Sequence, residues 1–156
     1  MKKNALVALA TIVGSTAVAA ALGGRRSGDS RWYRRLRKPA LTPPPIVFPV
    51  AWTALYALQA ASAFRVWRAP RSSHRTTALA LWATQLGLNA AWSPLFFRRH
   101  APRSALADVA LLDVALAAYV HRATKVDRTA ALLAAPYLAW IGFATYLNAE
   151  IVRLDR

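Results

Sequence analysis

The sequence has no cysteine and only six acidic residues among its 156. The missing cysteines exclude a disulfide framework, a cysteine nucleophile and a thiolate metal site. Only 17% of the residues are charged, and the 21 lysines and arginines gather in short segments between long uncharged runs. A net charge of +15 suggests nucleic-acid binding in a soluble protein. Because the charge alternates with apolar runs, the pattern is instead typical of a membrane protein, and we expect no nucleic-acid partner.

Five apolar runs have about the length that a helix needs to cross the hydrocarbon core of a bilayer. They cover residues 4–22, 46–67, 78–97, 104–121 and 129–152. A transmembrane strand would alternate apolar and polar residues, and these runs do not. Since only helices and closed barrels satisfy the backbone in lipid, the sequence predicts an all-α integral membrane bundle of five transmembrane helices, a single domain over residues 1–156.

The first run allows a second interpretation. Lys2 and Lys3 precede it, and the small residues Ala17, Ala19 and Ala20 lie near its end. This arrangement also occurs in cleavable secretory leaders. A retained helix gives five spans, whereas cleavage leaves four.

The connector 23–45 is strongly basic and must lie outside the hydrocarbon. Its glycines end the first helix, and the prolines at 43–45 cannot continue one. Twelve lysines and arginines lie on the side of this connector and of the C-terminus, against nine on the other side. By that small margin the positive-inside rule places the connector and the C-terminus in the cytoplasm of a multi-pass cell-membrane protein.

Polar and aromatic side chains inside the runs mark where function is expected, because unpaired polar groups are costly in hydrocarbon. At 3.6 residues per turn, three runs each present aromatic rings beside amides or phenols on one face. The three faces are Trp52, Tyr56, Gln59 and Ala63; Gln85, Asn89, Trp92 and Phe96; and Tyr137, Trp140, Ala144 and Asn148. A cavity for a flat apolar ligand and plain packing through interhelical hydrogen bonds account for these faces equally well.

Conventional catalytic motifs are missing. The histidines lie in or beside connectors without metal-ligand spacing, so no metal site is expected. The sequence offers no glycine-rich phosphate loop and no paired catalytic carboxylates. Of the two aspartates in the fourth run, Asp108 is expected to meet Arg98, Arg99 or Arg103. Asp113 is expected to be neutral or to pair with an amide or phenol of a neighbouring helix.

The third run carries two further features. Ala83, Gly87 and Ala91 recur every four residues, a small-residue strip that permits either tight packing within the chain or a homodimer seam. Trp82 is expected at the membrane interface, where tryptophan collects.

Taken in order, these motifs resemble the translocator protein family, also called TspO/MBR, peripheral benzodiazepine receptor or tryptophan-rich sensory proteins. The resemblance covers most of the chain, from Trp32 to about Asn148. Its carriers are Trp32-Tyr33, Leu36, Lys38-Pro39, Pro43-Pro44, Phe48-Pro49-Val50-Ala51-Trp52, Leu55-Tyr56, Gln85-Leu86-Gly87-Leu88-Asn89, Trp92-Ser93-Pro94-Leu95-Phe96-Phe97, Ala105 to Asp108, Pro136-Tyr137-Leu138-Ala139-Trp140, Phe143-Ala144 and Leu147-Asn148.

The resemblance implies a five-helix bundle, often a homodimer, whose first connector closes a cavity at one end. Members of this family bind porphyrins such as protoporphyrin and haem, sterols such as cholesterol, and isoquinoline or benzodiazepine-type drugs. Bacterial members are linked to tetrapyrrole and stress regulation. The expected function is therefore porphyrin binding inside the bundle, with porphyrin or haem as ligand and no cofactor required. A light- and oxygen-dependent porphyrin-degrading enzyme and a porphyrin or sterol transporter are the alternatives.

The family's pocket can be carried over by motif. The expected ligand-binding residues are Tyr33, Pro43, Pro44, Trp52, Tyr56, Gln85, Asn89, Phe96, Trp140 and Ala144. If the protein degrades porphyrin, Trp52 and Trp140 are the expected catalytic residues. Arg34, Arg37 and Lys38 are expected to hold the anionic propionates, with anionic lipid headgroups as their alternative partners.

The chain departs from the family at three points. Leu41 stands where a tryptophan commonly precedes the double proline, and Arg98 stands where a glycine usually follows the two phenylalanines. The cholesterol-recognition pattern at the C-terminus also fails, because six residues separate Tyr146 from Arg153. Sterol binding is left open by this sequence but receives no support from it.

Overall fold

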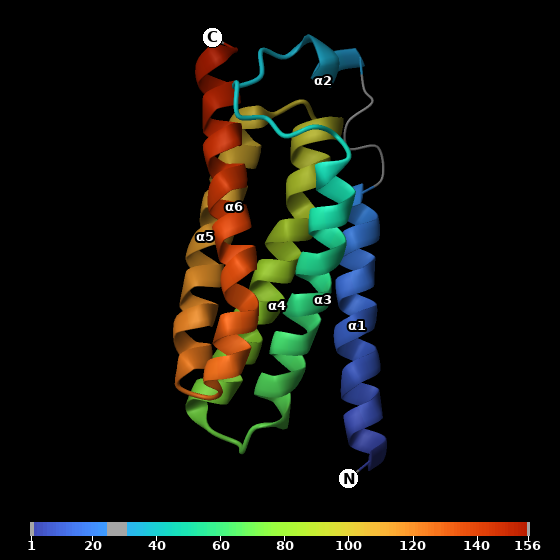
Figure 1. Ribbon diagram of the computed structural model, residues 1–156, viewed down its shortest axis with the longest axis vertical. Helices are drawn as coiled ribbons and strands as arrows, with labels where there is room; N and C mark the ends of the chain where they lie inside the picture. The colour runs from blue at the N-terminus through green and yellow to red at the C-terminus, as the bar shows by residue number, and fades with distance from the viewer. Residues whose placement is uncertain (1, 25–30, 156) are drawn as a thin grey trace.

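Five long helices run side by side in the computed structural model, which describes residues 2–24 and 31–155 (Figure 1). They are α1 (Lys2–Gly24), α3 (Val47–Arg68), α4 (Ser73–Ser93), α5 (Pro102–Thr124) and α6 (Arg128–Leu154). The residues in these two ranges form no strand. The predicted all-α bundle is therefore confirmed.

Two short elements differ from the prediction. The connector contains a five-residue helix, α2 (Arg31–Arg35), which lies across one end of the bundle (Figure 1). The predicted run 78–97 is divided, because α4 ends at Ser93 and a π-helical turn, η1 (Pro94–Arg98), follows. The Arg99 amide donates to the Pro94 carbonyl at 3.0 Å, the five-residue spacing of a π-helix.

The start of α4 also lies earlier than the apolar run indicates. Ser72 is extended, and its hydroxyl accepts a hydrogen bond from the Arg75 amide at 3.1 Å. This N-cap satisfies one of the free amides of the first turn. The helix therefore begins at the polar residue Ser73, before the hydrophobic stretch starts at Ala78.

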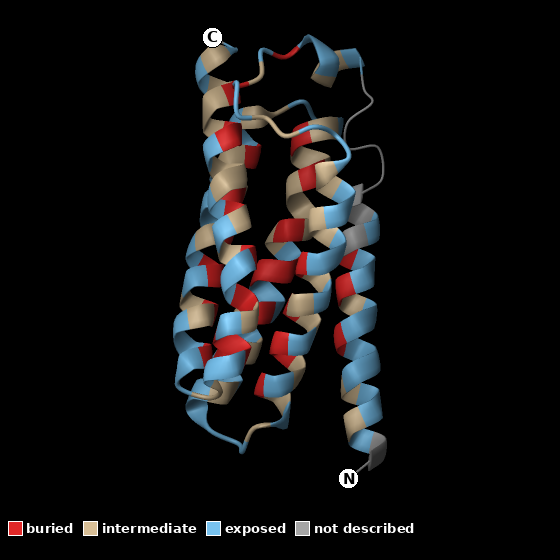
Figure 2. Ribbon diagram, in the orientation of Figure 1, coloured by how far each residue is buried: buried red, intermediate tan, exposed pale blue. Residues whose placement is uncertain are grey.

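Among the described residues, three helices are long and apolar enough to cross a membrane: α3, α5 and α6. The apolar part of α1 is the shorter stretch Asn4–Ala19. The fourth helix carries Gln85 and Asn89, which lower its hydropathy, but both side chains are buried within the bundle. Their polarity is thus turned away from lipid, while large apolar residues such as Leu111, Val114 and Leu132 are exposed on the outside (Figure 2).

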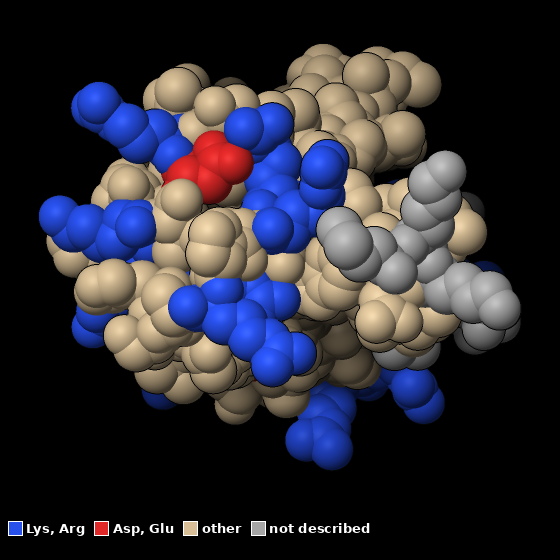
Figure 3. Space-filling view, turned by 90° about the horizontal axis from the view of Figure 1, so that it is seen from below, with Lys and Arg blue, Asp and Glu red and all other residues tan. Residues whose placement is uncertain are grey.

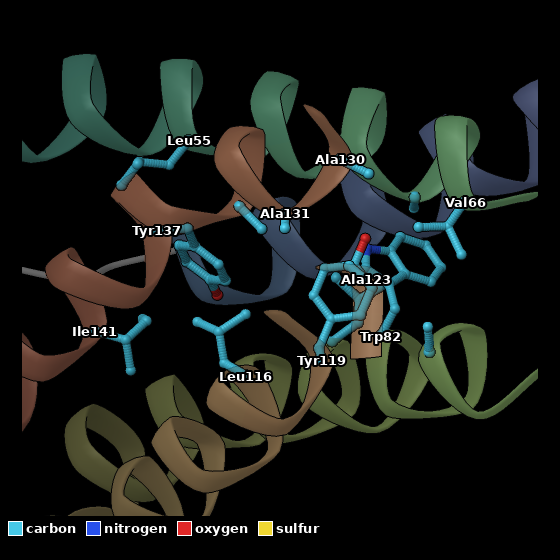
Figure 4. Packing of buried hydrophobic residues seen from close by; sticks show 14 of the residues in the cluster. Leu55, Val66, Trp82, Leu116, Tyr119, Ala123, Ala130, Ala131, Tyr137 and Ile141 are labelled. Atoms are coloured by element: carbon cyan, nitrogen blue, oxygen red, sulfur yellow. The ribbon is translucent and has the colours of Figure 1, made fainter. Parts of the chain in front are cut away.

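The core takes in residues of all five long helices, and the part drawn in Figure 4 lies among α3, α4, α5 and α6. Leu112, Leu116 and Tyr119 recur at helical spacing on α5, and Tyr137 and Ile141 face them from α6; each is at most 1% exposed. Fully buried alanines allow the backbones to approach closely. These alanines are Ala63, Ala78, Ala105, Ala123, Ala130 and Ala134.

Polar contacts tie the helices together at the end away from α2. The Ser62 hydroxyl donates to the Ala130 carbonyl at 2.7 Å, so the Tyr119 hydroxyl donates to Ser62, at 2.6 Å. Arg65 forms an ion pair with Asp127 at 2.9 Å. Basic side chains otherwise dominate this end, where they surround an acidic group (Figure 3).

Replacing Asp127 with alanine is expected to lower the free energy of unfolding by about 1–2 kcal/mol, the sum of a lost helix cap and an exposed ion pair. The Asp127 carboxylate caps α6 by accepting a hydrogen bond from the Ala130 amide at 3.0 Å. Burial alone raises the pKa of Asp127, but the hydrogen bonds from Ala130 and Arg65 and the Arg65 charge together bring that pKa below its ordinary value.

A carboxylate with a lowered folded pKa stabilises the protein above its unfolded pKa of about 4, and this stability is lost as the pH falls toward the folded value. Thermal unfolding in detergent should therefore show a gap between wild type and Asp127→Ala at pH 7 that closes in acid. Asp127→Asn, which keeps a capping side chain, should show a smaller gap. Equal unfolding temperatures for wild type and Asp127→Ala at pH 7 would contradict this role.

Candidate functional site

Asn89 on α4 joins α3 and α6 through two phenols. The Tyr56 hydroxyl donates to Asn89 Oδ1 at 2.7 Å, and Asn89 Nδ2 donates to the Tyr137 hydroxyl oxygen at 2.8 Å. We call Tyr56, Asn89 and Tyr137 the Asn89 triad. Since an amide carries both donor and acceptor, one side chain satisfies the buried phenol of Tyr137 and the partly buried phenol of Tyr56.

Aromatic rings surround the triad. Trp52 stacks on Tyr56 with ring centroids 5.2 Å apart, and it contacts Tyr137 edge-on at 6.0 Å. Trp140 meets Trp52 edge-on at 6.4 Å. We call Trp52, Tyr56, Tyr137 and Trp140 the inner ring cluster. Both tryptophans are only partly buried, so each has part of its surface free of protein contact.

Two glutamines lie one turn from the triad with their hydrogen-bonding groups unused. Because α3 and α4 are antiparallel, one turn from the Tyr56–Asn89 bond toward the α3–α4 turn leads to Gln59 on one helix and Gln85 on the other. They are 1% and 0% exposed, and neither the oxygen nor the nitrogen of either carboxamide has a hydrogen-bond partner. An unmet buried polar group costs roughly 1–3 kcal/mol, so the bundle interior holds unused capacity to bind polar atoms.

A second aromatic cluster seats α2 on the end of the bundle. Phe96 is 1% exposed and packs against Trp32 at 5.4 Å and Tyr33 at 6.2 Å. Phe97 contacts Tyr33 at 5.4 Å. We call Trp32, Tyr33, Phe96 and Phe97 the lid cluster. Burial raises the pKa of Tyr33, and Lys38 Nζ lies 4.5 Å from the centre of its ring, a cation–π contact.

Trp92 lies between the lid cluster and the core, and packs against both. Its ring stacks on Phe96 at 5.0 Å, and its indole N–H donates to Asn148 Oδ1 at 3.0 Å. Asn148 Nδ2 in turn donates to the Pro102 carbonyl at 2.9 Å, at the start of α5. This chain of contacts holds the upper ends of α4, α5 and α6 together.

The structure divides the residues expected from sequence between these two regions. Trp52, Tyr56, Asn89 and Trp140 come together around the triad, with Gln85 one turn away. Tyr33 and Phe96 belong to the lid cluster. The other expected residues lie outside the inner ring cluster and the lid cluster: Ala144 is partly buried one turn beyond Trp140, Pro43 is partly buried and Pro44 exposed in the connector, and Arg34 in α2 and Arg37 just after it are exposed.

Two members of the inner site are absent from the set expected by motif: Tyr137 and Gln59. Helical spacing does place each on the correct face, Tyr137 with Trp140 and Gln59 with Tyr56. Spacing cannot show that the Tyr137 phenol completes a bridge through Asn89, because that depends on how the three helices pack.

Three other expectations need correction. Trp82 is 7% exposed and lies in the core, with its indole N–H unpartnered, so the interface position is wrong. Asp108 Oδ2 is buried without the expected arginine partner. Asp113 pairs with the Thr145 hydroxyl on α6 rather than with an amide or a phenol. Across the described ranges, no three histidine or acidic side chains come together as a metal site would require.

Residues 6–154 match the TspO/MBR family. The chain is 41% identical over 124 residues to the tryptophan-rich sensory protein of Cereibacter sphaeroides, covering 80% of this chain and 77% of that protein. It is 38% identical over 120 residues to the human translocator protein, covering 76% and 71%. A tryptophan-rich protein TspO from Chlorobaculum tepidum is 34% identical over 130 residues, covering 81% and 80%.

Proposed function

This chain belongs to the TspO/MBR family of multi-pass integral membrane proteins, and from that premise we propose that it binds porphyrins or related tetrapyrroles inside the bundle, at the inner ring cluster. One observation carries the proposal. Four aromatic rings from α3 and α6 gather around the Asn89 amide, with two unpartnered carboxamides one turn away.

The chemistry of these groups suits a flat, mostly apolar guest. Indole and phenol rings offer apolar faces and edges to a macrocycle, and aromatic contacts add roughly 0.5–1.5 kcal/mol each beyond the burial of area. The amides of Gln59, Gln85 and Asn89 are neutral and carry both donors and acceptors, which suits pyrrole nitrogens better than a charged group. The described side chains of the inner site carry no formal charge, so an anionic substituent would have to lie elsewhere.

We propose that the propionates of the ligand extend toward the basic segment around α2. Arg34 and Arg37 are exposed there, and Lys38 already contacts the Tyr33 ring. Charge-assisted hydrogen bonds from these side chains would hold carboxylates at the mouth of the bundle. Anionic lipid headgroups are the competing partners of the same cations.

The proposed role is the handling of tetrapyrroles or stress signalling through them, with the chain working as a homodimer. The small-residue strip on α4 supports the dimer, because Ala83 and Gly87 are exposed and a Cβ on Gly87 would meet no atom within 4 Å. Small residues allow two transmembrane helices to approach closely. Sterols remain a second ligand class for the same apolar interior.

Trp52→Leu should weaken protoporphyrin binding by about 2- to 10-fold, because it removes the ring that contacts three members of the inner ring cluster. The measurement is the shift of the porphyrin Soret band on titration into protein in lipid nanodiscs. Trp67→Leu is the matched control, since that indole stacks on Phe64 near the other end of α3. Equal dissociation constants for wild type and both variants would move the site away from the inner ring cluster.

Porphyrin breakdown is the second candidate function, favoured by the direct contact between Trp52 and Trp140. In the proposed breakdown reaction dioxygen is the oxidant, and the indoles of Trp52 and Trp140 exchange electrons with the light-excited porphyrin. The same samples test it under illumination, with Trp52→Phe as the variant, because phenylalanine keeps a ring for binding but is harder to oxidise. Faster loss of the Soret band in wild type than in Trp52→Phe supports the enzyme, and loss at the rate of free porphyrin excludes it.

A further inference from the structure

An open apolar groove of about 550 Å³ runs along the outside of the bundle between α3 and α6. Its lining consists wholly of apolar residues: Ala51, Ala54, Leu55, Leu58, Pro136, Ala139, Trp140 and Phe143. Both helices are long and apolar enough to cross the membrane. Because Ala54, Pro136 and Ala139 are exposed, the groove opens to the surroundings of the bundle, which in a membrane are lipid.

Trp140 belongs to both the groove and the inner ring cluster. Its indole forms part of the groove wall and meets Trp52 at 6.4 Å. Trp52 contacts Tyr137, whose hydroxyl accepts the hydrogen bond from Asn89. A continuous series of ring contacts therefore leads from the lipid-facing groove to the Asn89 triad.

Among the described residues, direct polar contacts between α3 and α6 lie at one end of the seam only, and nearer α2 the two helices are joined indirectly through Asn89 of α4. The two direct polar contacts, the Ser62–Ala130 hydrogen bond and the Arg65–Asp127 ion pair, both lie near the end away from α2. Between the described residues nearer α2, α3 and α6 meet through apolar and aromatic contacts without a direct hydrogen bond. Separating α3 from α6 there breaks no hydrogen bond that joins them directly, but it pulls on the bridge from Tyr56 through Asn89 to Tyr137. An apolar guest would replace the apolar contacts that are lost.

Two features of the groove make such a separation easier. Ala51, Ala54 and Ala139 have small side chains, so little interdigitation holds the walls together. Pro136 lies inside α6, where it cannot donate a backbone hydrogen bond to the preceding turn. Prolines within helices are common sites of bending, so α6 can flex beside the groove.

We propose that the α3–α6 groove is a second binding site, for an apolar ring-shaped ligand dissolved in the bilayer, and that this ligand passes from it to the inner ring cluster when Trp140 swings aside. The inference rests on the proposed function of the inner cluster, and adds an outer site and a route from lipid. Entry from the lipid is also favoured because the α2 end of the bundle is closed. There the lid cluster packs around the buried ring of Phe96.

The test separates the route from the inner site by comparing rates with equilibrium affinity. Ala54→Trp fills the groove from α3, and Ala139→Trp fills it from α6; Val114→Trp places the same bulk on an outward position of α5 that is 68% exposed. Protoporphyrin IX is dissolved in vesicles, which are mixed with nanodiscs holding each protein, and the Soret band is followed in time. If the groove is the entrance, filling it should slow both association and dissociation by about tenfold or more. The dissociation constant should stay within about twofold of the wild-type value.

The outcomes distinguish the two proposals. Slow exchange in either groove variant, with Val114→Trp like wild type, supports the route even if the other groove variant does not fold. Wild-type rates in the folded groove variants overturn it while leaving the inner site intact. Trp32→Ala, which loosens the lid cluster, should not accelerate uptake of porphyrin from vesicles. If Trp32→Ala accelerates uptake and the groove variants leave it unchanged, the entrance lies at the lid. Failure of the inner site itself would appear as an unchanged dissociation constant in Trp52→Leu.

Discussion

Replacing Phe96 with alanine is expected to lower the free energy of unfolding by about 3–5 kcal/mol, the usual cost of removing a fully buried aromatic side chain. Phe96 is 1% exposed, and its ring meets Trp32, Tyr33, Trp92 and Phe97 at centroid distances of 5.4, 6.2, 5.0 and 4.9 Å. The cavity cannot close easily, because the neighbouring rings are rigid and are held by separate elements.

This loss should detach α2 from the bundle. Thermal unfolding in detergent measures the stability, and trypsin cleavage within the basic segment 31–38 reports whether α2 remains seated. Leu111→Ala is the control, because Leu111 is 60% exposed on the outer face of α5 and should cost far less. Unfolding temperatures and cleavage rates like those of wild type in Phe96→Ala would contradict the packing of the lid cluster.

Asn89→Leu is expected to weaken porphyrin binding by about 10- to 100-fold. The change removes a buried hydrogen bond to the macrocycle, and it also removes the amide that holds the side chains of Tyr56 and Tyr137 in place. Without it, the hydroxyls of Tyr56 and Tyr137 lose their partner, and both phenols are free to turn. The dissociation constant from Soret titration in nanodiscs gives the effect directly.

The matched control for this change is Asn148→Leu. Asn148 is also a buried amide with two hydrogen bonds, to Trp92 and to the Pro102 carbonyl, but it lies outside the inner ring cluster. Its replacement should reduce stability and leave the affinity close to that of wild type. Equal losses of affinity in both variants would mean that general loosening of the bundle, and not the Asn89 triad, is responsible.

Much of the bundle can be predicted from the sequence, because a long uncharged run in a chain this basic has few alternatives to a transmembrane helix. Helical spacing also predicts correctly which faces point into the bundle: Trp52 with Tyr56 on α3, and Gln85 with Asn89 on α4. Spacing likewise places Tyr137 and Trp140 on one face of α6, and the family motifs add the position of the lid. The roles of these residues in ligand binding remain predictions for the experiments above.

What spacing misses depends on contacts between distant parts of the chain. Five residues in a basic connector give no signal for α2, which is held by Trp32 and Tyr33 packing on Phe96. The π-helical turn begins at Pro94, directly after α4, and the apolar runs give no sign of it. Half of the residues that line the α3–α6 groove are alanine or proline and the rest are apolar too, so no periodicity distinguishes the groove from an ordinary packed surface.

An experimental structure of the protein in lipid with protoporphyrin bound tests the central claim most directly. The account predicts the macrocycle against the rings of Trp52, Tyr137 and Trp140, within hydrogen-bonding reach of Asn89, with its propionates toward Arg34, Arg37 and Lys38. A macrocycle bound only at the basic rim or on the lipid-facing surface, with the inner ring cluster unchanged, would contradict it.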